Sequence, residues 1–452
     1  MRSSASAIGR RLYAAQAAAA QKTEAVQASL QKEQPKISKL ANGIQVVSVE
    51  NFSPVSKVVV VYNAGARFES SQNLGVTHAL RNAGALATKD TSFFGNVRNL
   101  ESFGASLSAT GTREHLIYTL DVLRNNFDAA MPFLASVVTA PVFNQWELDA
   151  AANRLKVNLA HYEQSACMRV METVHAAAYR DTLGRSLYSP AYMVGRHDAA
   201  AMADHWGRYC TPGRLAVVGL GVSHASLIDH VSHRFTAAAG GASADATTAR
   251  FGGGEIRELT GAPLAHAAVV AEGAAVTSAR DVVALALLQK LLGAGPTIKY
   301  GATATTLTSS LAKVATGPFA ASAVNASYTD SGVFGFYVVG QPADMAALLR
   351  AGMEEVRSLA KNGVTDQQLQ QVKQQLAAAV LMEEEDANEY AICLATQALH
   401  SGDLISSNDV LAAIAAATAA DVAAAAKRIV TGKLAMSAVG DLRNTPYLDE
   451  LV

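Results

Sequence analysis

Apolar residues recur with two different periods along residues 37–219, and each period predicts its own kind of element. Short β-branched runs predict strands, and segments with apolar positions three or four residues apart predict helices. An Asn-Gly pair, Asn42-Gly43, predicts a hairpin turn near the start. The elements predicted for this half are strands Ile44–Val49, Lys57–Tyr62, His115–Leu123 and Leu215–Gly219, a helix with apolar positions at Leu74, Leu80, Ala83 and Leu86, and helices Phe127–Val138 and Glu147–Tyr162.

The same order of elements returns in the second half of the chain. A local echo supports the repeat, because Arg208–Ala216 resembles Arg428–Ala435. In both, a helix end runs through a Thr-Gly turn into an apolar strand, which predicts a duplicated domain. The elements predicted for the second half are strands Ala265–Ala271, Val333–Val339 and Leu434–Val439, and helices Arg280–Leu292, Met345–Lys361 and Gln367–Glu383.

These elements predict an α+β protein of two homologous domains, each a mostly antiparallel β-sheet packed with α-helices. We place the first domain at residues 36–235 and the second at residues 255–452. Residues 236–254, rich in Ala, Gly, Ser and Thr, predict a flexible linker between the two domains.

The N-terminal segment has the composition of a mitochondrial presequence. It is basic through Arg2, Arg10 and Arg11, rich in alanine and serine, and free of acidic residues before Glu24. We predict a presequence over residues 1–13, cleaved after Tyr13, and a flexible lead-in over residues 14–35.

Composition excludes some classes of function. The formal net charge is -1, whereas phosphate binding needs a basic excess, so nucleic acid is not the expected partner. No run approaches the roughly 20 apolar residues of a membrane span; the longest candidates are Val282–Leu288 and Val410–Ala426. Three cysteines without a Cys-x-x-Cys pair predict buried or half-buried free thiols in a reducing compartment, namely Cys167, Cys210 and Cys393.

Candidate chemistry is concentrated in the segment Gly75–Asn82. Its residues His78, Arg81 and Asn82 are spaced i, i+3, i+4 and share one face of a helix. This segment, with the preceding Tyr62–Glu69, resembles the pitrilysin family of zinc peptidases. The resemblance implies a helix that carries His-x-x-Glu-His, in which both histidines and a distal glutamate bind zinc and the first glutamate is the general base.

When that motif is carried over residue by residue, only His78 remains. Arg81 stands at the general-base position and cannot accept a proton, and Asn82 stands at the second histidine position. The distal carboxylate position falls at Leu159, which cannot bind a metal. One ligand of three does not hold zinc. We therefore predict no catalytic residue, no bound metal and no cofactor, and hence an inactive peptidase homologue.

Other motifs favour structural roles. His224, His230 and His233 follow a glycine turn, but the apolar positions of that helix leave His230 on its flank and His233 facing solvent. Gly219-Leu220-Gly221 lacks the third glycine of a dinucleotide motif, and Leu292–Pro296 lacks the Lys-Ser/Thr of a phosphate loop. Neither a metal site nor a nucleotide site is expected here.

Several stretches away from this helix resemble the inactive family members that form the core subunits of the mitochondrial ubiquinol–cytochrome c reductase, respiratory complex III. The resemblance implies a non-catalytic subunit, peripheral on the matrix side of the inner membrane, that supports assembly. It also implies that core protein 1, cytochrome b, cytochrome c1 and the Rieske protein are partners. The stretches are Glu50–Ser56, Gly219–His224, Gly253–Glu258, Leu292–Pro296 and Asn325–Tyr337.

Two alternatives stay open at this point. The first is the non-catalytic, substrate-binding subunit of the mitochondrial processing peptidase, whose long glycine-rich loop is not matched by the short segment Gly293–Gly301. The second is an active metallopeptidase with displaced ligands, which one tightly bound zinc per chain would reveal.

Overall fold

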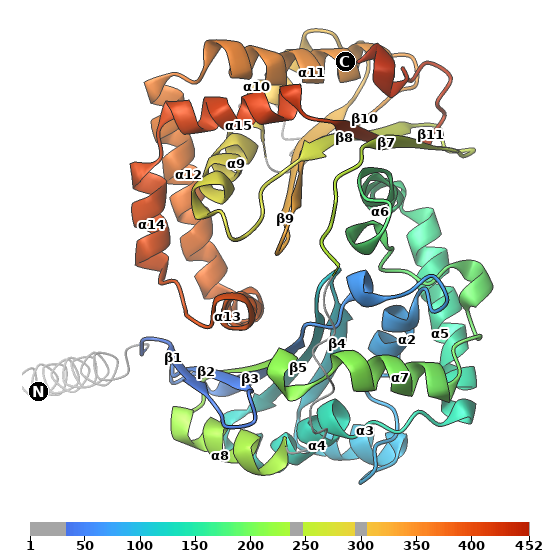
Figure 1. Ribbon diagram of the computed structural model, residues 1–452, viewed down its shortest axis with the longest axis vertical. Helices are drawn as coiled ribbons and strands as arrows, with labels where there is room; N and C mark the ends of the chain where they lie inside the picture. The colour runs from blue at the N-terminus through green and yellow to red at the C-terminus, as the bar shows by residue number, and fades with distance from the viewer. Residues whose placement is uncertain (1–32, 236–246, 294–304, 452) are drawn as a thin grey trace, which may run out of the picture.

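Two β-sheets, one in each half of the chain, form the framework of the protein (Figure 1). The computed structural model describes residues 33–235, 247–293 and 305–451. The predicted presequence, residues 14–32 of the predicted lead-in and residues 236–246 of the predicted linker lie outside these residues. The first sheet has the order β1-β2-β6-β3-β5-β4, formed by Lys36–Lys39, Gln45–Val49, Leu215–Leu220, Val55–Tyr62, Leu116–Leu123 and Ser106–Gly111.

The second sheet repeats five strands of the first. Its order is β7-β11-β8-β10-β9, formed by Gly254–Leu259, Leu434–Gly440, Ala265–Glu272, Gly332–Gly340 and Ala320–Ser327. Strand β6 pairs parallel with β2, β11 pairs parallel with β7, and the other pairs are antiparallel. The prediction of two homologous α+β domains with mostly antiparallel sheets is confirmed.

Both faces of each sheet are covered, which explains why the central strands are apolar throughout. On β3, Val58 and Val60 belong to one buried cluster, and Val59 and Val61 belong to another. Successive strand residues point to opposite faces, and all four valines are fully buried. A strand buried on both sides reads as a continuous apolar run and not as an alternation.

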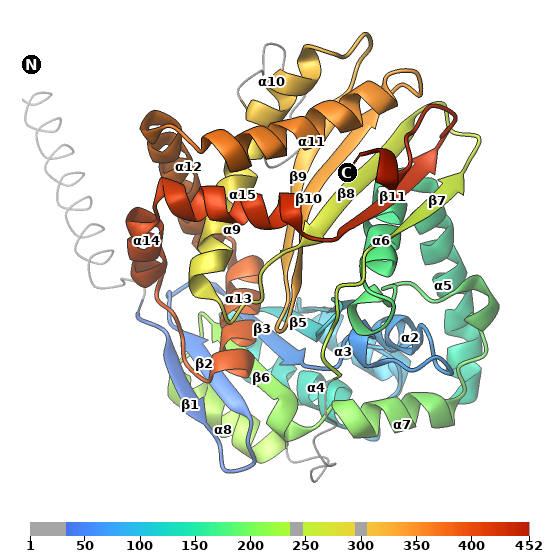
Figure 2. The ribbon, with the colours of Figure 1, turned by 45° about the horizontal axis from the view of Figure 1, so that its top comes forward.

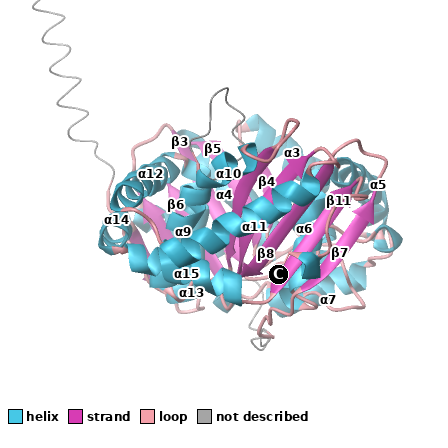
Figure 3. Cartoon of the chain, turned by 90° about the horizontal axis from the view of Figure 1, so that it is seen from above, coloured by secondary structure: helices cyan, strands magenta, loops and turns pink. Residues whose placement is uncertain are grey.

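Helices from the same half cover the outer face of each sheet, and Figure 3 shows this for the second sheet, seen from above. In the first half these and the neighbouring helices are α2 Val76–Asn82, α3 Phe93–Ser102, α4 Phe127–Thr139, α5 Gln145–Gln164, α7 Ala199–Tyr209 and α8 His224–Arg234. In the second half they are α9 Ala279–Leu292, α10 Thr306–Ala312, α11 Met345–Asn362, α12 Asp366–Glu385, α14 Ser407–Ala416 and α15 Ala419–Thr431.

The inner face of each sheet is covered by a helix from the opposite half (Figure 2). Helix α6, Ala166–Ala178, packs Val170 and Val174 against strands β8 and β11 of the second sheet. Helix α13, Ala387–Ser401, packs Leu394 against β2, β3 and β6 of the first sheet. This reciprocal exchange joins the two halves through two buried apolar clusters.

Some elements differ from their prediction. The helix predicted to continue through Leu86 ends at Asn82, because the chain turns at Ala83 and Gly84. Strands β4, β7 and β9 were not predicted. They lie at sheet edges, where partial exposure leaves a weaker apolar pattern. Among the described helices, no single one is long and apolar enough to cross a membrane; α14 and α15 together pass by length and composition but are bent by 87°.

Candidate functional site

Helix α2, which carries the candidate motif, is fixed at its start by a buried carboxylate. Glu69 accepts hydrogen bonds from the backbone N–H groups of Gly75 at 2.7 Å and Thr77 at 3.0 Å. Burial raises the pKa of Glu69, although the hydrogen bonds from Thr77 and Gly75 oppose that rise. Gly75 has φ +82°, and a Cβ at this position would lie 2.4 Å from Ser189. Only glycine therefore permits this close approach.

His78 is buried, with 1% of its surface exposed, and its hydrogen bonds define its tautomer. Its Nδ1 accepts the backbone N–H of Ser189 at 3.1 Å, so a neutral ring carries its proton on Nε2. That Nε2 lies 3.5 Å from the side-chain amide nitrogen of Asn158 on α5. Burial, reinforced by the nearby charge of Arg81, lowers the pKa of His78 to about 3, so the ring is neutral at physiological pH.

Two asparagines complete the polar cluster beside His78. The Nδ2 of Asn158 donates to Oδ1 of Asn82 at 3.1 Å, and the Nδ2 of Asn82 donates to the backbone carbonyl of His78 at 2.9 Å. On α5 the side chain that lies beside both His78 and Asn82 is Asn158, so we place the distal ligand position there and not at the predicted Leu159. Successive helix residues are rotated by about 100°, so neighbouring side chains leave a helix in different directions.

Arg81 takes the place of the general base and brings a fixed positive charge. Its guanidinium lies over the ring of Tyr188, 5.7 Å from the ring centroid. Burial lowers the pKa of Arg81, but a guanidinium remains protonated in proteins. Arg154 of α5 lies on the same side and donates to the backbone carbonyl of Asn82 at 3.4 Å. The site can therefore donate hydrogen bonds and attract anions, and it cannot accept a proton from water.

These residues do not fit a zinc ion. A metal-binding histidine usually donates its second ring N–H to an acceptor, whereas Nδ1 of His78 is itself an acceptor. Asn82 and Asn158 offer neutral amides, and Arg81 places a positive charge beside them. In the part of the chain that the structure describes, no group of three or more His, Cys, Asp or Glu side chains is placed to hold a metal ion.

The other histidines singled out from the sequence do not converge. His224 lies between the hydroxyls of Ser38 at 2.9 Å and Ser48 at 2.8 Å, and so ties α8 to strands β1 and β2. His230 contacts the carboxylate of Asp128 at 2.7 Å, and His233 is exposed, as the pattern of the helix predicted.

The cysteines only partly match their predicted burial. Cys210 is buried, whereas Cys167 and Cys393 are exposed and not half-buried. All three are free thiols, and each lies on a different part of the fold. Nothing in their placement brings two of them together for shared chemistry.

Sequence reasoning missed a charged cluster that links the two halves. The guanidinium of Arg67 is 3% exposed; it pairs with Glu114 of the first half and with Asp330 of the second, 2.8 Å away. The backbone N–H and hydroxyl of Thr329 also donate to Glu114. The tip of the β9–β10 hairpin is thereby anchored on the first domain. Arg67 lies within the stretch that resembles the pitrilysin family, but its partner Asp330 is 263 residues away.

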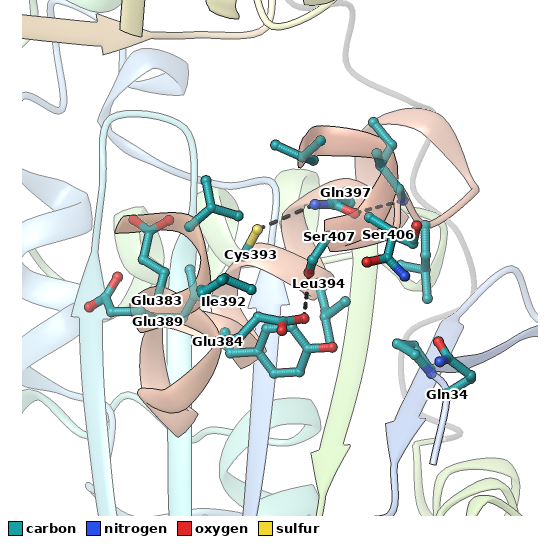
Figure 4. Close-up of a pocket in the computed structure, with 18 of the residues that line it drawn as sticks. Gln34, Glu383, Glu384, Glu389, Ile392, Cys393, Leu394, Gln397, Ser406 and Ser407 are labelled. Carbon is teal, nitrogen blue, oxygen red and sulfur yellow. Dashed lines mark hydrogen bonds between the residues drawn. The ribbon is translucent and has the colours of Figure 1, made fainter. Parts of the chain in front are cut away.

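A cavity of about 560 Å³ lies between α12, α13 and α14, near the first described residues (Figure 4). Gln397 donates to the sulfur of Cys393 at 3.3 Å and accepts from the backbone N–H of Ile405 at 3.0 Å. Although Cys393 counts as an exposed residue, the surrounding chain desolvates its sulfur and so raises the pKa of the thiol, which disfavours the reactive thiolate. The lining also includes Glu383, Glu384 and Glu389, and it contains no residue of the degenerate site.

Comparisons with protein families and with individual proteins agree with this geometry. A profile described as insulinase, peptidase family M16, matches residues 45–191, and one described as peptidase M16 inactive domain matches residues 198–376. The chain is 39% identical to subunit 2 of the mitochondrial cytochrome b-c1 complex of Mus musculus over 444 residues, which cover 98% of each chain.

Two further relatives place this likeness in context. The human cytochrome b-c1 complex subunit 2 is 39% identical over 415 residues, which cover 92% of this chain and 91% of the relative. The mitochondrial-processing peptidase subunit alpha of Solanum tuberosum is 25% identical over 419 residues, which cover 91% of this chain and 83% of the relative.

Proposed function

From the premise that this chain belongs to the insulinase family, peptidase family M16, we propose that it is the non-catalytic core protein 2 of the mitochondrial ubiquinol–cytochrome c reductase. The observation that carries the proposal is the 39% identity to a cytochrome b-c1 complex subunit 2 across 98% of both chains. Likeness to a processing peptidase subunit over a similar length is lower, at 25%.

The degenerate site supports the non-catalytic part of this proposal. Metal-assisted peptide hydrolysis needs three protein ligands, an open coordination position and a general base. His78 is held by the backbone N–H of Ser189, which donates to its Nδ1, and Arg81 stands where a base is required. The chain is an inactive peptidase homologue, and its contribution to the complex is structural.

The expected setting is the matrix side of the mitochondrial inner membrane, where the chain would be peripheral. Its partners would be core protein 1, facing it across the cavity that a peptidase pair would enclose, and the cytochrome b, cytochrome c1 and Rieske subunits. The small net charge of -1 suits burial in such an assembly, because little self-repulsion opposes association.

Native electrophoresis of detergent-solubilised mitochondria tests the assignment. We expect the chain to co-migrate with the absorbance of haem b and haem c. Alkaline extraction should release it from membranes, and protease should reach it only after the inner membrane is opened. Co-migration with presequence-cleaving activity in a band without haem would refute the proposal and favour the processing peptidase subunit.

A further inference from the structure

The degenerate site opens into a second cavity, of about 300 Å³, between α2, the edge strand β4 and α5. We propose that this cavity is a binding pocket for an oxyanion, namely a carboxylate or phosphate group. Its polar lining consists of Arg81, Asn82, Ser108, Arg154 and Asn158. The remaining lining residues are small or apolar: Gly84, Ala85, Leu107 and Ala109.

Two positive charges face this cavity without a carboxylate partner among the described residues. Arg81 contacts the ring of Tyr188, and Arg154 reaches only the backbone carbonyl of Asn82. Arg81 is partly buried and Arg154 is exposed, whereas the fully buried Arg67 of this domain pairs with Glu114 and Asp330. A pocket with two unneutralised guanidinium groups raises the local concentration of anions.

The nearest candidate for a neutralising carboxylate is already engaged. Glu172 raises the pKa of Arg81 through its electrostatic field, without pairing with the guanidinium. One of its oxygens accepts from the guanidinium of Arg113 at 2.8 Å, and the other accepts from the backbone N–H of Leu187 at 2.9 Å. The charge of Arg81 therefore remains available to a ligand.

The pocket also supplies neutral hydrogen-bonding groups that suit an oxyanion. Asn82 and Asn158 carry amide groups, and Ser108 carries a hydroxyl that can donate. A planar guanidinium can bind two oxygens of one carboxylate or phosphate at once. The volume of about 300 Å³ lies at the lower end of the range for small-molecule sites, so the ligand is a small anion or a single acidic side chain.

Calorimetric titration of the full-length chain at constant ionic strength tests the proposal, with inorganic phosphate and malonate as the free anions. A short peptide with a central aspartate, and its asparagine counterpart, test whether the oxyanion comes from a side chain. We expect saturable binding of at least one of these anions. Arg81→Gln and Arg154→Gln should each weaken it about tenfold or more, as expected for the loss of a charge-assisted hydrogen bond.

The matched control is Arg350→Gln, which changes an exposed arginine of α11 outside the pocket and should leave the affinity unchanged. If Arg81→Gln fails to fold, Arg154→Gln decides, because Arg154 is exposed on the surface of α5. No binding of any of these anions, or equal binding by the wild type and the folded arginine variants, would overturn the proposal. The inference does not depend on the proposed role in assembly, since the pocket belongs to one chain.

Discussion

Asn158 on α5 donates a hydrogen bond from its side-chain amide to Oδ1 of Asn82 on α2, over 3.1 Å. This bond joins the two helices whose side chains, in the resemblance to active pitrilysin peptidases, would bind one metal ion. A neutral amide pair takes the place of the ion as the link between them. The structure thus keeps the framework of a metal centre after its chemistry has been lost.

The first prediction concerns rebuilding that centre. The double variant Arg81→Glu/Asn82→His restores the base and one ligand, and we expect neither stoichiometric zinc nor chelator-sensitive peptide cleavage, because the third ligand is missing. Adding Asn158→Glu should supply it, because Asn158 lies beside both His78 and Asn82. Zinc content measured after dialysis is the readout.

The matched control for that experiment adds Leu159→Glu to the double variant in place of Asn158→Glu. We expect no zinc in this control, because Asn158 is the α5 residue whose side chain lies beside both His78 and Asn82. Equal zinc content in the two triple variants, or zinc in the double variant, would contradict the ligand geometry.

Some residues of this site were predictable from the sequence and one was not, for a physical reason. His78, Arg81 and Asn82 were predictable because they lie within one helix, where spacing alone determines which side chains share a face. Asn158 was missed because its position depends on the lengths of all the loops between α2 and α5. A shift of one residue in that count selects a different side of the helix.

The same distinction holds for the whole fold. The central strands and the helices α4, α5, α9, α11 and α12 were predicted because local periodicity marks them, whereas α6, α13 and α15 were not. The exchange of α6 and α13 between the two sheets was not predictable, because a helix pattern shows that one face is buried but not which sheet buries it. The pair of Arg67 and Asp330 was hidden for the same reason.

The second prediction concerns the charged link between the halves. Asp330→Asn removes a carboxylate that pairs with the guanidinium of Arg67 at 2.8 Å, and Arg67 is almost fully buried. We expect the free energy of unfolding to fall by about 1–3 kcal/mol, because Arg67 keeps the carboxylate of Glu114 but loses its second carboxylate partner. Urea unfolding measures the change. Asp204→Asn, at an exposed pair with Arg208, is the control and should have little effect.

The third prediction concerns pH and the buried ring of His175. Its Nδ1 donates to the backbone carbonyl of Met171 at 2.7 Å, and its Nε2 accepts from the hydroxyl of Tyr328 at 2.8 Å. Burial, with the charge of Arg113, lowers the pKa of His175 to about 3. Below the unfolded pKa of about 6.5, the unfolded chain gains a proton that the folded chain does not.

Stability should therefore fall as the pH drops from about 6.5 toward 3, with a limit of about 1.4 kcal/mol per pH unit for this group. In urea titrations between pH 7.5 and 5, the free energy of unfolding of His175→Gln should fall less steeply with decreasing pH than that of the wild type. The difference in slope should correspond to about one fewer proton taken up on unfolding. His233→Gln, at an exposed histidine, should keep the pH dependence of the wild type. An unchanged slope in His175→Gln would show that this ring does not contribute.

The last prediction concerns the exchanged helices. Leu394 of α13 belongs to the second half but is 3% exposed against the sheet of the first half. Leu394→Ala should lower the free energy of unfolding by about 2–5 kcal/mol, because it leaves a cavity in that contact. Both tryptophans, Trp146 and Trp206, lie in the first half, so their fluorescence reports on that half. If the two halves unfold as one unit, this change in the second half must shift the tryptophan transition and the far-ultraviolet circular dichroism transition together.

Leu381→Ala, at a leucine that is 47% exposed on α12, is the control and should shift neither transition by more than about 0.5 kcal/mol. A dichroism shift without a tryptophan shift would show that the halves unfold separately, and that α13 is not an obligatory part of the first domain.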